Sequence, residues 1–114
     1  MLTVYGIRTC DTVRKARKWL DAHGVAYRFH DFRQQGLEPA LLRRWLDRAG
    51  WEALLNRRGT TWRALPEAVR TGIDAHRAAS LLLEQPTLIK RPVVDDGRAV
   101  QVGFDPQEYE RRFR

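Results

Sequence analysis

The sequence predicts an α/β domain in which a β-α-β segment, a helical insert and a β-β-α segment follow one another. Three observations carry this prediction: a strand, helix and strand pattern in the first 32 residues, helical periodicity through the middle, and a hairpin signal at Asp96-Gly97 before a last helix. The 114 residues suit one compact domain and suffice for a core without disulfides.

The first part of the chain predicts a βαβ unit. Residues 2–5 alternate polar and apolar side chains, and residues 26–32 are rich in aromatic residues, so both segments indicate strands. Between them, residues 11–22 have a helical pattern, and Gly24 is a stop signal just past its end. The apolar face of this helix holds Val13, Ala16 and Leu20. This spacing predicts parallel strands with a right-handed connection.

The middle of the chain predicts helices. Pro39 suits the first position of a helix that runs to about Ala49, and Trp51–Leu55 indicates another short helix. Residues 56–63 are polar and basic and predict a loop. A further helix begins after Asp74, a plausible N-cap, and ends at Pro86.

The last part predicts two strands and a helix. Residues 88–94 lead into the third strand, and the turn at Asp96-Gly97 predicts that residues 99–102 pair with it antiparallel. Asp105 and Pro106 open the last helix, with Glu108 as a capping-box residue. Tyr109 and Phe113 are expected to face the core.

This order of elements is that of the thioredoxin-like fold with a four-stranded mixed sheet. We therefore expect a single domain over residues 1–114, with a helical insertion at about residues 37–86. The arrangement places Cys10 where that fold keeps its redox thiol, with the insert as a helical cap beside it.

Cys10 is the only cysteine and lies in the predicted first turn of a helix. Free N–H groups and the positive end of the helix dipole favour a thiolate there, and Arg8, Arg14 and Lys15 add positive charge that Asp11 opposes. These surroundings predict a nucleophile with a pKa below that of a free cysteine. The alternative interpretation is a buried, inert cysteine that packs as a small apolar side chain.

The composition predicts a cytoplasmic protein without disulfides. One cysteine cannot form an internal disulfide, no apolar run reaches bilayer length, and the chain starts directly with a strand rather than a signal peptide. The net charge of +7 suits acidic partners such as nucleic acid or small anions, or is simply a basic surface. Because the basic residues are spread over several elements, we expect no specific nucleic-acid binding.

Three segments together resemble the arsenate reductase family of the type coupled to glutathione and glutaredoxin. They are residues 6–12 with Cys-Asp-Thr, residues 56–63 with Arg-Gly-Thr-Thr-Trp-Arg, and residues 88–93. The chain is most similar to the YffB-type branch, and the family also includes the related Spx-type regulators. The resemblance covers essentially the whole chain.

The resemblance assigns roles to particular residues. It implies that Cys10 is the catalytic cysteine and that Arg91 binds the substrate oxyanion just before a cis-proline, Pro92. A second family arginine falls near Asn56 and Arg57, and a third falls in residues 102–105, which hold no basic residue. An arsenate ion would therefore be bound more weakly here.

We accordingly expect an enzyme, a glutathione-dependent monothiol oxidoreductase with Cys10 as nucleophile and glutathione as the thiol that resolves the adduct. No tightly bound cofactor is expected, and glutaredoxin is a candidate partner of a monomeric protein. The residues expected to bind the glutathione or an anion are Arg91, Pro92, Arg57, Arg58 and Arg63, and those expected to stabilise the thiolate are Arg8 and Arg14.

Two alternatives stay open. One is a true arsenate reductase, and the other is a non-catalytic, Spx-like protein that binds RNA polymerase. The second position of the Cys-x-x-Cys switch found in Spx-type regulators is Val13 here, so that switch is absent. His23, His30 and His76 are scattered, so no metal site is expected.

Overall fold

The computed structural model describes residues 1–113 and consists of two compact units. The first unit combines residues 1–36 with the chain from Arg91 onwards, and the second comprises Leu37–Lys90. The insertion expected at residues 37–86 falls within the second unit.

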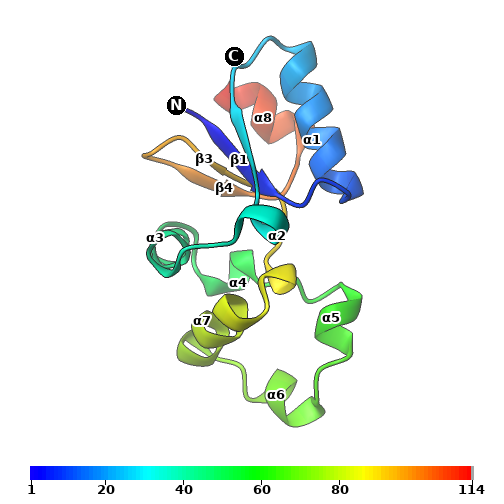
Figure 1. Ribbon diagram of the computed structural model, residues 1–114, viewed down its shortest axis with the longest axis vertical. Helices are drawn as coiled ribbons and strands as arrows, with labels where there is room; N and C mark the ends of the chain where they lie inside the picture. Colours follow the sequence, from blue (N-terminus) through cyan, green and yellow to red (C-terminus); the bar gives the residue numbers. More distant parts are fainter. Residues whose placement is uncertain (114) are drawn as a thin grey trace. The chain divides into compact units, whose positions relative to one another are not determined.

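The first unit contains a four-stranded mixed sheet with the strand order β2-β1-β3-β4 (Figure 1). Strand β1 (Thr3–Gly6) pairs parallel with β2 (Arg28–Asp31) and antiparallel with β3 (Val93–Asp95). Strand β3 in turn pairs antiparallel with β4 (Val100–Val102). The α/β class and the mixed, thioredoxin-like sheet predicted from the sequence are thereby confirmed.

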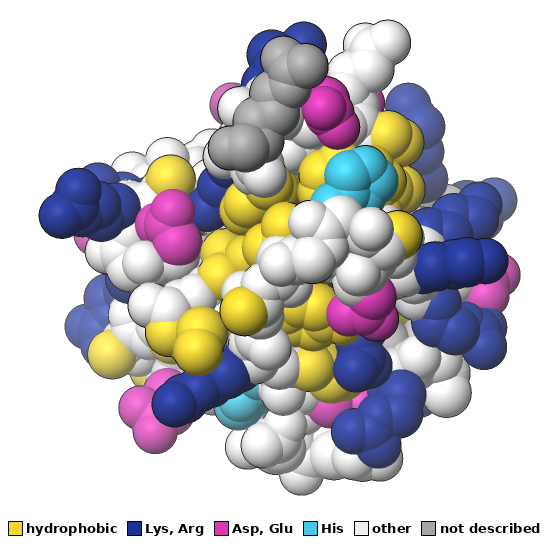
Figure 2. Space-filling view, turned by 90° about the horizontal axis from the view of Figure 1, so that it is seen from above, with side chains coloured by type: hydrophobic (Ala, Val, Ile, Leu, Met, Phe, Trp, Pro, Cys, Tyr) yellow, Lys and Arg dark blue, Asp and Glu magenta, His cyan; other side chains and the backbone are white. Residues whose placement is uncertain are grey.

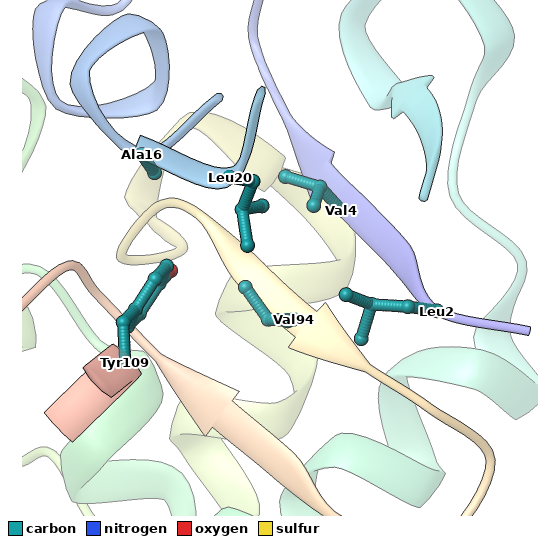
Figure 3. Packing of buried hydrophobic residues seen from close by; sticks show 6 residues of the cluster. All are labelled: Leu2, Val4, Ala16, Leu20, Val94 and Tyr109. Atoms are coloured by element: carbon teal, nitrogen blue, oxygen red, sulfur yellow. The ribbon is translucent and has the colours of Figure 1, made fainter. Parts of the chain in front are cut away.

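Two helices of the first unit cover part of its core. Helix α1 (Asp11–Ala22) connects the two parallel strands, and α8 (Pro106–Arg112) follows the hairpin. Figure 3 shows how α1, β1, β3 and α8 contribute to one apolar cluster. The cluster consists of Leu2, Val4, Ala16, Leu20, Val94 and Tyr109. The Tyr109 ring meets Phe104 edge-on, with 4.9 Å between centroids, and its hydroxyl donates to the Gly103 carbonyl at 3.0 Å.

The second strand ends earlier than the sequence predicts. Phe32 was expected to be its last residue, but Asp31 ends β2 and caps a short helix, α2 (Phe32–Gln35). The Asp31 carboxylate accepts hydrogen bonds from the first amides of α2, which is the usual way an aspartate starts a helix. Phe32 is buried from the helix rather than from a strand.

The second unit is helical. Asp74 caps its last long helix by accepting a hydrogen bond from the Arg77 amide at 2.9 Å, as predicted. Leu55 and Ile89 form an isolated antiparallel bridge. The helices are α3 (Pro39–Ala49), α4 (Trp51–Leu54), α5 (Thr60–Arg63), α6 (Glu67–Thr71), α7 (Ala75–Glu84) and the 3-10 turn η1 (Pro86–Leu88).

The structure differs from the loop expected at residues 56–63 and shows where the third strand begins. Residues 56–63 are a loop only as far as Gly59, because the next four residues form α5 and bury Trp62. Leu88 belongs to η1, so the third strand begins only at Val93.

Candidate functional site

Cys10 lies at the junction between a tight turn and α1. Its amide donates to the Ile7 carbonyl at 3.0 Å, and its own carbonyl accepts from the Arg14 amide at 3.0 Å. Cys10 therefore closes a four-residue turn and occupies the N-cap position of α1, with an extended backbone. The side chain is half-buried and its thiol is free.

The surroundings of Cys10 lower its pKa below the ordinary value. Burial acts in the opposite direction and is the largest single influence, but it is outweighed by the Val13 amide and by the hydrogen bond and positive charge of Arg91, with a smaller effect of the Thr12 amide. Both amides belong to the first turn of α1, where N–H groups have no partner within the helix. A lowered pKa means that more thiolate, the reactive form, is present at neutral pH.

Arg91, which hydrogen-bonds the Cys10 thiol, is far from it in the sequence and begins the second segment of the first unit. It directly precedes Pro92, and the peptide bond between them is cis, as the family pattern implies. Pro92 is buried, and its carbonyl accepts a hydrogen bond from the Gly103 amide at 2.8 Å. Arg91 itself lies two residues before β3 and is half-buried.

The other cations near Cys10 in the sequence have different partners. The Arg14 guanidinium pairs with the Asp11 carboxylate and donates to the Thr9 carbonyl at 3.2 Å. The Arg8 guanidinium lies over the Phe29 ring, 5.9 Å from its centroid. The cation whose effect on the Cys10 pKa stands out is thus Arg91, and the thiolate-stabilising roles expected for Arg8 and Arg14 stay predictions.

Three further candidate arginines belong to the second unit and are exposed. Arg57 lies over the rings of Trp51 and Trp62, at 5.3 and 5.9 Å from their centroids. The Arg63 guanidinium donates to the Arg58 carbonyl at 2.9 Å. Arg57 and Arg58 line a surface hollow with Glu52, Leu55, Asn56 and Lys90. Their role in binding an anion stays a prediction.

Asp31, which no motif in the sequence singled out, contacts the segment that leads into Cys10. Only 2% of its surface is exposed, and its carboxylate accepts hydrogen bonds from the amides of Arg8 (3.0 Å), Arg33 (2.9 Å) and Gln34 (3.3 Å). Burial raises its pKa, yet these three amides and the Arg8 charge outweigh burial and lower it. The available signal was an aspartate near the end of the predicted strand, a residue type that commonly caps the start of a helix.

No group of three or more His, Cys, Asp or Glu side chains within residues 1–113 could hold a metal ion. Among the helices of that same range, none combines the length and the apolar character that crossing a membrane requires.

Comparison with known proteins identifies the family. The ArsC family model matches residues 5–112. An uncharacterized protein of Haemophilus influenzae is 47% identical over 114 residues, covering 99% of both chains. The global transcriptional regulator Spx 1 of Lactococcus lactis is 29% identical, over 95% of this chain and 85% of its own length.

Solved structures agree with this result. The YFFB protein superimposes with a TM-score of 0.91 at 48% identity and covers 97% of both chains. An arsenate reductase (ArsC) related protein from Brucella melitensis has a TM-score of 0.81 at 50% identity, over 99% of this chain and 94% of its own. The predicted resemblance to the arsenate reductase family, its YffB-type branch and the Spx-type regulators is confirmed.

Proposed function

Because the chain belongs to the ArsC family, a family of thiol oxidoreductases, we propose that it is a glutathione-dependent monothiol oxidoreductase with Cys10 as the nucleophile. One observation carries the proposal: a half-exposed thiol at the N-cap of α1, with its pKa lowered by the first-turn amides and by Arg91. A reducing, cytoplasmic location is part of the same proposal, because glutathione is abundant there.

The reaction needs only one protein thiol. The Cys10 thiolate attacks the glutathione sulfur of a mixed disulfide, so that an S–S bond forms at Cys10 and the substrate leaves as its thiolate. A second glutathione, as thiolate, then attacks the glutathione sulfur of the adduct. This step releases oxidised glutathione and restores the Cys10 thiolate. Over the cycle one glutathione thiol is oxidised, leaving in oxidised glutathione together with the glutathionyl group of the substrate, and the substrate sulfur is reduced to a thiolate.

The basic residues supply binding groups for the tripeptide. Arg91 stabilises the thiolate and offers a charge-assisted hydrogen bond to a carboxylate, and the backbone before Pro92 offers strand-like pairing to a peptide. Arg57, Arg58 and Arg63 are proposed as further ligands of the two glutathione carboxylates, because their side chains are exposed.

The rate of adduct formation tests this function. Reduced protein is incubated with oxidised glutathione at neutral pH and followed by intact mass, beside the same protein in denaturant and a Cys10→Ala variant. We expect one glutathionyl group on the native protein, gained faster than by the unfolded chain, removed by glutaredoxin and absent from the variant. An adduct formed no faster than in the unfolded chain would contradict the proposal.

A second candidate function is partner binding. It is favoured by the 29% sequence identity to the transcriptional regulator Spx 1, which extends over 95% of this chain. A column of immobilised RNA polymerase should then retain the protein, and the Cys10→Ala variant should be retained equally well.

Reduction of arsenate is a third possibility that the same thiol permits. A steady-state assay with arsenate and glutathione, with and without glutaredoxin, tests whether the protein reduces arsenate.

A further inference from the structure

The Asp31 carboxylate uses its two oxygens for two different tasks. Oδ1 accepts from the Arg33 and Gln34 amides and caps α2, whereas Oδ2 accepts from the Arg8 amide at 3.0 Å. The backbone of Asp31 is fixed as well, because it is paired with Gly6 across the parallel strands. The carboxylate therefore joins the end of β2 to the segment that leads into Cys10.

The Arg8 amide lies within the turn that Cys10 closes. In that turn the Ile7 carbonyl accepts from the Cys10 amide, so Arg8 is the second of its four residues. The bond to Oδ2 attaches this turn to the sheet two residues before the cysteine. An ionised, buried carboxylate is a strong acceptor, and its hydrogen bonds to amides are stronger than those of a neutral group.

We propose that Asp31 is a positioning residue for Cys10: by holding the Arg8 amide, it fixes the turn so that the thiol lies against the first-turn amides of α1. The proposal rests on the proposed function, in which Cys10 is the reactive group. It assigns Asp31 no contact with the substrate.

The direction in which the Cys10 pKa changes when Asp31 is replaced distinguishes a positioning role from a direct effect of the Asp31 charge. Replacement of Asp31 by asparagine removes a negative charge, which by itself would favour the thiolate and lower the Cys10 pKa. Loss of the attachment moves the thiol relative to the amides that stabilise the thiolate, which raises the pKa. A positioning role thus predicts a rise, against the direct electrostatic effect.

The first experiment uses Asp31→Asn. The Asn oxygen can still cap α2, but its NH₂ group cannot accept from the Arg8 amide. We expect the pH midpoint of alkylation by iodoacetamide to shift upward and alkylation at neutral pH to slow by about threefold, the size of losing a helix N-terminus effect. The matched control is Asp105→Asn, which changes the N-cap of α8 in the same unit and should leave the midpoint unchanged.

A second experiment removes the donor instead of the acceptor. Arg8→Pro deletes the amide hydrogen, and proline suits the second position of such a turn, where Arg8 has a negative φ. Its reference is Arg8→Ala, which removes the same guanidinium and keeps the amide. We expect Arg8→Pro to have a higher alkylation midpoint than Arg8→Ala, and Asp31→Asn to add little to Arg8→Pro because both remove one hydrogen bond.

Failure of this proposal can be distinguished from failure of the proposed glutathione-dependent function. Alkylation uses no glutathione, so a protein that fails the glutathione test still reports the effect of Asp31 on the thiol. An unchanged or lowered midpoint in Asp31→Asn, or no difference between Arg8→Pro and Arg8→Ala, overturns the proposal. If Asp31→Asn does not fold, the Arg8 pair decides, together with hydrogen exchange of the Arg8 amide in the unaltered protein, where exchange at the unfolded rate would also overturn it.

Discussion

The reactivity expected of Cys10 results from a balance between burial, which disfavours the thiolate, and a few contacts that favour it. The contact with Arg91 differs from the others because it combines a hydrogen bond with a positive charge and depends on a side chain. It can therefore be removed without changing the backbone of α1.

Arg91→Ala should raise the pKa of Cys10. The alkylation midpoint should move to higher pH, so the variant should lose reactivity first in the neutral range, where the unaltered protein still holds thiolate. Since the thiolate exists above the pKa, the reactivity of both proteins should fall as the pH drops through their respective midpoints. Arg98→Ala removes the same charge from the exposed hairpin turn and is the control. Equal midpoints for the two variants would show that only net charge matters.

Helix α1 packs very closely against strand β1, where Gly6 faces Val13. A Cβ atom on Gly6, the last residue of β1, would lie 2.7 Å from a methyl carbon of Val13 in the first turn of α1. Only glycine allows the helix that carries Cys10 to approach the sheet this closely.

Gly6→Ala should therefore destabilise the protein by about 1–3 kcal/mol, the usual cost of overpacking a core. Urea unfolding measures the change. Val13→Ala removes the two methyl groups that the new Cβ would meet, so the double variant should lose less stability than the sum of the single changes. Strict additivity would indicate that the contact is unimportant.

The β3–β4 turn depends on Asp96. Its carboxylate accepts from the Ala99 and Arg98 amides and pairs with Arg112 at 3.2 Å, which lowers its pKa to about 2. Since the folded pKa is below the unfolded one, the unfolded state binds more protons between them, and stability falls as the pH drops from about 4 to about 2.

Asp96→Asn should reduce this acid sensitivity. Asparagine keeps an acceptor for the turn amides but does not titrate. The stability difference between the two proteins should be constant above about pH 5 and shrink toward pH 2, by no more than about 1 kcal/mol, because the carboxylate is 40% exposed and screened by solvent. Chemical unfolding at a series of pH values checks this, and parallel curves would contradict it.

The helices that the sequence predicts are mostly longer than those that it does not predict. Helices α1 and α3 lie where the sequence predicts them, because each has an apolar stripe over three turns and a clear start and stop. The helices α2, α5 and α6 were not predicted, because four or five residues give only a weak periodic signal, which sufficed for the equally short α4 but not for these three. Cys10 and Arg91 stood out by motif, whereas Asp31 did not, because its role depends on a pairing across 23 residues.

At the scale of the whole molecule, the positive charge has no single location. Figure 2 shows Lys and Arg side chains at separate places on one face, with Asp and Glu among them. We therefore expect weak, unspecific nucleic-acid binding that disappears by about 0.2 M salt, since purely electrostatic contacts weaken steeply with salt. Titration of duplex and single-stranded DNA tests this. Sequence-selective binding that survives such salt would contradict it.

The groups that set the Cys10 pKa and the arginines of residues 57–58, proposed as glutathione ligands, belong to different units of the chain. Every group that sets the Cys10 pKa, and the Asp31 attachment as well, belongs to the first unit. The exposed Arg57 and Arg58 belong to the second. If these arginines bind glutathione, their loss should change the affinity for glutathione and leave the thiol unchanged.

Arg58→Ala should therefore raise the KM for glutathione by about two- to fivefold, the size expected for an exposed ion pair, with the alkylation midpoint of Cys10 unaltered. The double change of Arg57 and Arg58 should raise KM further. Arg48→Ala, which removes another exposed arginine, from α3 in the same unit, is the matched control for net charge. An unchanged KM in Arg58→Ala would exclude this residue from the glutathione site, and a shifted midpoint would show that the second unit acts on the thiol itself.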